Sequence, residues 1–303
     1  MQISRRHVTL GIVVSAALLV TGIAVLKWRE GNTFSETRAL LSRFPAEDAI
    51  VLNIDLASVR KAGLLSASKI PLEPEYKKFL DGTAFDYRRD LDSVTASFSK
   101  SGNFFIARGR FNWSKLRDYA THQGGSCYQE LCRMPGSTPE RRISFLPLRD
   151  DTLALAVSTD DLAANRLTKE GDPVSAPIPS SPVWMSVPGT ALRQAGGLPS
   201  GLRLMLSAMT NADRLTITVD TANNGLAAKL DAACRTPDDA RILASQLRTV
   251  TATLKEALQT DKDAQADVLA QTLAAGAFDD SGAHVNGRWP FNKSLISSLT
   301  DGI

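Results

Sequence analysis

Hydrophobic and polar residues alternate along two stretches of this chain, and each stretch turns back on itself. Residues 92–111 (DSVTASFSKSGNFFIARGRF) and 213–233 (DRLTITVDTANNGLAAKLDAA) each contain two alternating segments, separated by glycine and asparagine. A period of two residues is typical of a strand with one buried face, and glycine or asparagine suits the tight turn between antiparallel strands. The pattern therefore predicts two β-hairpins.

These hairpins belong to a longer internal resemblance. An ungapped shift lays Ile50–Leu65 on Val183–Leu198, with apolar residues opposite apolar residues and identities at Arg60, Ala62, Gly63 and Leu65. Each segment begins as an apolar strand pattern and continues as a helix pattern, and the hairpins follow in the same order. We therefore predict a β-α-β-β-α unit that occurs twice.

Helix-start signals follow each of the two hairpins. Asn112 is a favourable N-cap, and Thr236-Pro237-Asp238-Asp239 supplies a cap, a helix-compatible proline and two first-turn acids. Apolar residues then recur near helical spacing over 236–260, which predicts the longest helix of the chain outside the membrane.

A further hairpin and a short helix are predicted after each unit, with the hairpins at 141–158 and 276–289. Between the copies, residues 169–182 contain four prolines, a composition typical of a linker. We predict that 29–168 and 183–303 are two α+β halves, built from antiparallel sheet with helices packed on one face.

The most apolar stretch of the chain, Val8–Leu26, contains no charged residue. A helix of this length reaches roughly 28 Å, close to the hydrocarbon thickness of a bilayer. Lys27 and Trp28 follow it, instead of the small residues of a cleavage site, which favours a retained anchor over a cleaved signal peptide. Residues 1–28 are thus predicted to be a cytoplasmic tail and membrane anchor.

The predicted fold class is α+β, with an N-terminal transmembrane helix followed by two pseudo-repeated β-α-β-β-α(-ββα) halves with antiparallel sheet. Basic residues flank the apolar stretch on both sides, so charge does not determine the orientation. A long domain after a first apolar helix commonly crosses the membrane, and we therefore expect a single-pass inner-membrane protein with most of the chain outside the cytoplasm.

Composition narrows the range of functions. Hydrophobic residues make up 43% of the chain and charged residues 22%, which is ordinary for a globular protein. The net charge of +3 comes from 35 basic and 32 acidic residues that are evenly mixed, so no nucleic-acid partner is expected. The sequence contains no G-x-S-x-G elbow, no G-x-G-x-x-G motif and no phosphate-binding loop, and no cofactor is predicted.

Cys127 and Cys132 lie close together in a segment bounded by glycine and proline pairs. Outside the cytoplasm they are expected to form a disulfide that staples a loop or short hairpin. Cys234 lies in an apolar strand pattern and is expected to be buried. The alternative for Cys127 is a nucleophilic thiolate with His122 as its base, which requires a cleft and a third, orienting group.

Acidic and basic clusters give weaker signals. Asp279, Asp280 and His284 are the best candidates for metal ligands, but they lack the spacing of a calcium loop or a zinc framework, so no metal site is predicted. Residues 85–93 (FDYRRDLDS) form the most charged cluster. We expect its arginines to pair with the acids of the same segment; the alternative is contact with an anionic head group or a partner.

One local pattern resembles a known group of proteins. A single N-terminal anchor, a Pro45-Ala46-Glu47-Asp48-Ala49 entry, a strand and an Arg60-x-Ala62-Gly63-Leu64-Leu65 helix end are similar to uncharacterised single-anchor bacterial envelope proteins. The resemblance implies an envelope location and assigns no activity.

Three functional hypotheses follow. The favoured one is a membrane-anchored extracytoplasmic protein that acts as a non-enzymatic binding or envelope-interaction module. The alternatives are a carrier of a hydrophobic ligand and a hydrolase with an unidentified site that uses His122 or an acidic residue. The expected partners are the membrane, through the N-terminal helix, and an envelope protein or a hydrophobic ligand. No residue is assigned to catalysis, cofactor binding or a metal.

Overall fold

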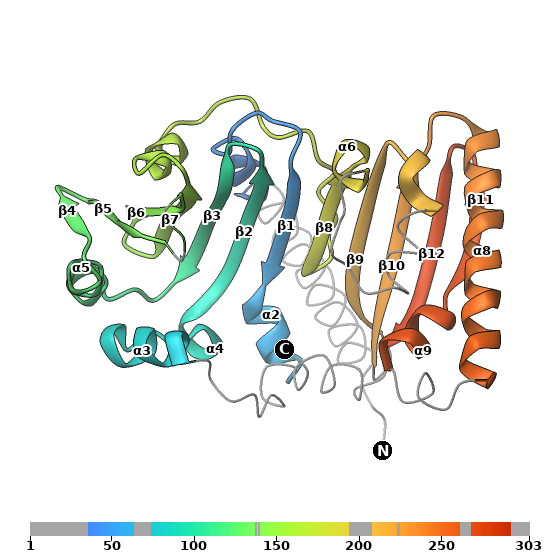
Figure 1. Cartoon of the computed structure of the whole chain (residues 1–303), viewed down its shortest axis with the longest axis horizontal. Coiled ribbons are helices and arrows are strands. Elements are labelled where there is room, and N and C mark those ends of the chain that lie inside the picture. The colour runs from blue at the N-terminus through green and yellow to red at the C-terminus, as the bar shows by residue number, and fades with distance from the viewer. Residues whose placement is uncertain are drawn as a thin grey trace, which may run out of the picture.

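The computed structural model describes residues 36–63, 74–136, 138, 140–193, 208–222, 225–260 and 268–291. Its strands form one antiparallel sheet of twelve strands (Figure 1). Their order across the sheet is β11 (Ala277–Ser281), β12 (His284–Phe291), β10 (Gly225–Ala233), β9 (Arg214–Ala222), β8 (Val183–Pro188), β1 (Ile50–Asp55), β2 (Leu91–Ser99), β3 (Gly102–Gly109), β7 (Thr152–Ser158), β6 (Arg142–Arg149), β5 (Leu131–Pro135) and β4 (Ser126–Tyr128).

The predicted hairpins are confirmed as neighbouring strands. β2 pairs with β3 through a turn next to Ser99 and Gly102, and β9 pairs with β10 from Arg214 opposite Ala233 to Ala222 opposite Gly225. The hairpins β6–β7 and β11–β12 occur at the predicted places. The pattern was sufficient here because a hairpin is a local structure whose register follows from its turn.

The two central strands, β1 and β8, join the earlier and later parts of the chain. They pair antiparallel, from Val51 opposite Ser186 to Ile54 opposite Val183. Each strand would otherwise expose a row of unpaired backbone groups, and the pairing satisfies both edges at once. Residues before and after 169–182 therefore share one continuous sheet.

Helices and short 3₁₀ segments lie at both faces and at the ends of the sheet. They are α2 (Leu56–Lys61), α3 (Pro74–Thr83), α4 (Tyr87–Asp90), α5 (Trp113–His122), η1 (Ala163–Thr168), α6 (Gly189–Leu192), η2 (Met209–Asn211), α8 (Pro237–Thr260) and α9 (Val268–Ala274), preceded by a helix over 36–41. The predicted caps are confirmed: the Asn112 side chain accepts the Lys115 N–H, and the Thr236 hydroxyl accepts the Asp239 N–H.

The helices were predicted to pack on one face of the sheet, but they cover both faces. α5 packs on Phe145 and α8 packs on Leu230. These two residues lie on the same face of the sheet, because a row of directly opposite residues connects them from strand to strand: Phe145, Leu155, Phe105, Ala96, Leu52, Met185, Ile217 and Leu230. The opposite face carries Phe104 and Ile106, which pack with η1 and with the helix over 36–41. Both faces of β3 are apolar, so both need cover.

The predicted linker packs against this second face. The Gly171 N–H donates to the Ser42 carbonyl at 2.7 Å, and Val174 is 5% exposed within the core around Phe104. We call residues 171–178 the strap. Its prolines exclude regular structure, while its apolar side chains still gain from burial.

The predicted fold class requires correction. No helix in the described ranges is long and apolar enough to cross a membrane. The longest of them, α8, is amphipathic: Leu243 and Leu247 face the sheet while Ile242 is 56% exposed. The predicted anchor, Val8–Leu26, lies outside the described residues. The described chain is an α+β fold with one antiparallel sheet of twelve strands, to which both predicted halves contribute strands.

Candidate functional site

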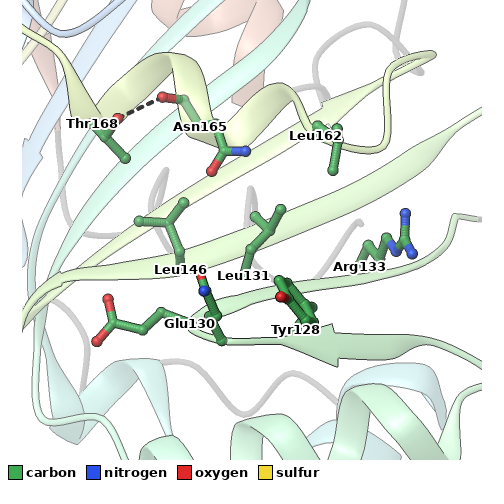
Figure 2. Close-up of a pocket in the computed structure, with 9 residues that line it drawn as sticks. Tyr128, Glu130, Leu131, Arg133, Leu146, Leu162, Asn165 and Thr168 are labelled. Carbon is green, nitrogen blue, oxygen red and sulfur yellow. Dashed lines mark hydrogen bonds between the residues drawn. The ribbon is translucent and has the colours of Figure 1, made fainter.

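A groove lies at one end of the sheet, between the β4–β5 hairpin and η1. Its volume is about 670 Å³, within the range of ligand-binding sites in proteins. Figure 2 shows Leu131 and Leu146 projecting from neighbouring strands toward Leu162 and Asn165 of the 3₁₀ region. The groove therefore has a strand floor on one side and a helical wall on the other.

Strand alternation gives the hairpin two different faces. Cys127 and Cys132 are directly opposite each other in the β4–β5 pair, with Cα atoms 4.0 Å apart, and they form a disulfide. Cys132 is fully buried in the cluster under α5. Tyr128 and Leu131, one residue away in each strand, point to the groove side. The disulfide thus holds the strand floor of the groove from the face opposite the groove.

The groove is open to solvent and is lined by both apolar and polar side chains. Tyr128 is 77% exposed and Leu162 is 45% exposed. Within the described residues, the only other large hydrophobic residue that is exposed is Ile242, on α8. Two of three such side chains thus line one groove, together with Leu131 and Leu146. A concentration of exposed apolar side chains in one place is typical of an interaction site.

Two of the polar residues that line the groove, Arg133 and Thr168, already have hydrogen-bond partners. Arg133 donates to the Asp161 carboxylate at 3.1 Å and to the Ser126 hydroxyl at 3.1 Å. The Thr168 hydroxyl donates to the Asn165 carbonyl at 2.8 Å. These contacts suit a polar rim around an apolar floor, and they hold no nucleophile beside a general base.

The Cys127 and His122 pair is not a catalytic dyad in this structure. Cys127 is oxidised in the disulfide, and the His122 ring contacts the carbonyl of Asp118, in its own helix, at 2.6 Å. Cys234 is buried as expected, and burial raises the pKa of its thiol. The hydrolase alternative gains no support from these groups.

Two of the three candidate metal ligands, Asp280 and His284, contact other side chains. His284 contacts Asp231 at 2.7 Å, and Asp280 pairs with Arg248 at 3.2 Å. Across the part of the chain that is described, no three histidine, cysteine or acidic side chains gather as metal ligands would. Asp279, Asp280 and His284 form no such group.

The charged segment 85–93 forms a structural ion-pair cluster. Asp90 is 7% exposed and accepts two hydrogen bonds from Arg89, at 2.9 and 2.8 Å, and one from Arg110 at 3.2 Å. The Arg89 guanidinium holds the pKa of Asp90 well below its usual range, although burial acts in the opposite direction. Pairing inside the segment was predicted, but Arg110 lies on another part of the chain and was missed.

Sequence reasoning also missed the groove itself. Its lining comes from the hairpin, from β6 and from η1, which are separated along the chain and meet only in the sheet. The one local signal was Tyr128, an aromatic residue enclosed between two cysteines near a turn.

No family model and no curated protein matches this chain. Among solved structures, crystal form III of TP0453 is similar with a TM-score of 0.52 and 11% identity, covering 86% of this chain and 97% of that one. Crystal forms I and IV of TP0453 have TM-scores of 0.45 and 0.43 at 9% identity, covering 86% of this chain and 96% of theirs. At such identity, the likeness to form III shows a related fold and nothing further.

The hydrophobic-carrier alternative stays a prediction. One observation agrees with it: Leu52, Val94, Phe98 and Phe105 form a half-buried apolar surface across β1, β2 and β3, on the face shared with α5.

Proposed function

We propose that this protein is a non-enzymatic binding module that acts in an oxidising, extracytoplasmic compartment and holds an extended polypeptide segment of another protein in the β4–β5/η1 groove. The observation that carries the proposal is the exposure of Tyr128 and Leu162 in one groove whose strand floor is held by a disulfide. Aromatic residues with large exposed areas commonly dominate the free energy of protein association.

The groove lies beside an edge strand of the sheet, and this position favours an extended peptide over a compact ligand. Among the described residues, β4 is the last strand, and no other strand pairs with its outer edge. Cys127 is opposite Cys132 with Cα atoms 4.0 Å apart, the short spacing of a non-hydrogen-bonded pair, so the backbone N–H and C=O of Cys127 point away from β5. An extended segment can bond to such an edge while its side chains enter the adjacent groove.

Selection from a random dodecapeptide library displayed on phage tests the binding function. The full-length protein should enrich peptides with alternating apolar residues, and Tyr128→Ser should weaken their binding by about tenfold or more, since it removes an exposed aromatic anchor. Ile242→Ser is the matched control, because Ile242 is also an exposed apolar residue but lies on α8; it should change affinity by less than about twofold. Equal binding to wild type and Tyr128→Ser would exclude the groove as the site.

Thiol labelling tests the compartment. Disulfides persist in oxidising compartments and are rare where thiols are kept reduced. When cells that make the protein are lysed into denaturant with maleimide and no reductant, only Cys234 should be labelled, because Cys127 and Cys132 are joined. Addition of a reductant before labelling should raise the number to three. Three labelled cysteines without reductant would place the protein in a reducing compartment and contradict the proposal.

A further inference from the structure

A second cavity lies on the sheet face that carries Phe104, between the helix over 36–41, the strap and the start of β9. Its volume is about 560 Å³. The strap is held in place here by burial of Val174 and by the hydrogen bond from Gly171 to Ser42. Leu41, Val174 and Ile178 give the cavity apolar walls, and Arg38 and Arg214 also line it.

Arg214, at the start of β9, is a half-buried cation. Its Nη1 donates to the hydroxyl of Ser186, a fully buried neutral residue, at 3.1 Å. In the described ranges, Arg214 has no ion pair with a carboxylate. The adjacent Asp213 pairs instead with Arg235, at 3.7 Å. A guanidinium has five N–H donors, so most of those on Arg214 remain available.

The charge balance of the cavity favours an anion. Arg214 lines the cavity, and among the described lining residues none is acidic. Removal of a cation from water is costly unless an opposite charge or hydrogen-bond acceptors replace the lost hydration. A carboxylate or phosphate group would accept two parallel hydrogen bonds from a guanidinium and supply that charge.

We propose that this cavity is a binding site for an amphiphilic anion. The carboxylate or phosphate group binds Arg214, and the hydrocarbon part packs against the accessible apolar side chains of the strap, Pro173, Ala176 and Ile178. The site shares no lining residue with the β4–β5/η1 groove. The inference therefore does not depend on the proposed peptide-binding function.

Calorimetric titration of the full-length protein tests the site with four probes: decanoate, decyl phosphate, decanol and inorganic phosphate. The two amphiphilic anions should bind at least about tenfold more tightly than decanol, which lacks the charge, and than inorganic phosphate, which lacks the apolar part. A preference between decanoate and decyl phosphate identifies the anionic group. Equal affinity for decanol and decanoate would overturn the proposal.

Variants locate the bound anion at Arg214. Arg214→Met keeps much of the side-chain volume and should weaken decanoate binding by about tenfold or more, because the charge-assisted hydrogen bonds are lost. Arg235→Met is the control, since Arg235 is the neighbouring exposed arginine, and it should change the affinity by less than about twofold. Arg214→Lys keeps the charge without the fork geometry and should bind with intermediate affinity. Unchanged binding in a folded Arg214→Met or Arg214→Lys protein would contradict the assignment.

Discussion

Trp184→Ala should lower the free energy of unfolding by about 3–5 kcal/mol, the range measured when large buried aromatic residues are truncated. Trp184 is 1% exposed and is among the largest fully buried side chains of the described chain. It lies on β8, after the strap, yet it packs with Val51 and Phe104, which precede the strap. Its removal leaves a cavity in a core to which both parts of the chain contribute.

The same variant tests whether the sheet unfolds as a unit. Because β1 and β8 are paired and Trp184 belongs to the core of the earlier part, chemical denaturation of wild type and variant should show one transition by both fluorescence and circular dichroism. Ile242→Ala is the matched control; Ile242 is 56% exposed, and its truncation should cost less than about 0.5 kcal/mol. Two separate transitions, of which Trp184→Ala shifts only the one that belongs to the part of the chain after the strap, would show that the parts before and after the strap unfold independently.

Asp90→Asn should lower the free energy of unfolding by about 1.5 kcal/mol at pH 7. The substitution keeps the shape of the side chain but removes the charge that receives the hydrogen bonds of Arg89 and Arg110. The expected effect is at the lower end for charged hydrogen bonds, because both arginines are largely exposed, at 66% and 69%, and water screens them.

The effect of Asp90 on stability should depend on pH with a defined sign. Its pKa in the folded state lies below the unfolded value of about 3.9, so in acid the unfolded chain binds more protons than the folded one. The stabilising contribution is thus complete above about pH 5 and declines as the pH falls through about 4 toward the folded-state pKa. The difference between wild type and Asp90→Asn should therefore become smaller from pH 5 to pH 3.

Denaturation curves at a series of pH values measure this dependence. Asp92→Asn is the control, because Asp92 is 58% exposed and its contact with Arg60 is long, at 3.5 Å. It should change stability by less than about 0.5 kcal/mol. A constant difference between wild type and Asp90→Asn over the whole pH range would mean that the carboxylate charge is not the source of the stabilisation.

Features predicted correctly from the sequence depend on neighbours along the chain. They are the β2–β3 and β9–β10 hairpins, the caps at Asn112 and Thr236, and the disulfide between Cys127 and Cys132, and each joins residues or strands that are close together along the chain. Their hydrogen bonds and covalent geometry are decided within one turn or one hairpin, so the local pattern contains the necessary information.

Only the tertiary structure showed which distant residues meet. The apolar patterns of β1 and β8 predicted two strands, but alternation of apolar and polar residues does not show which strand edges pair with each other. The same limit applies to the β4–β5/η1 groove and to Arg214, whose surroundings come from the strap and from the helix over 36–41. By itself the sequence determined the local elements, their caps and the disulfide. Long-range burial and edge pairing decided the union of these elements in one sheet, the shared core around Trp184 and the two cavities. These features depend on contacts between residues far apart in the chain, which local patterns do not contain.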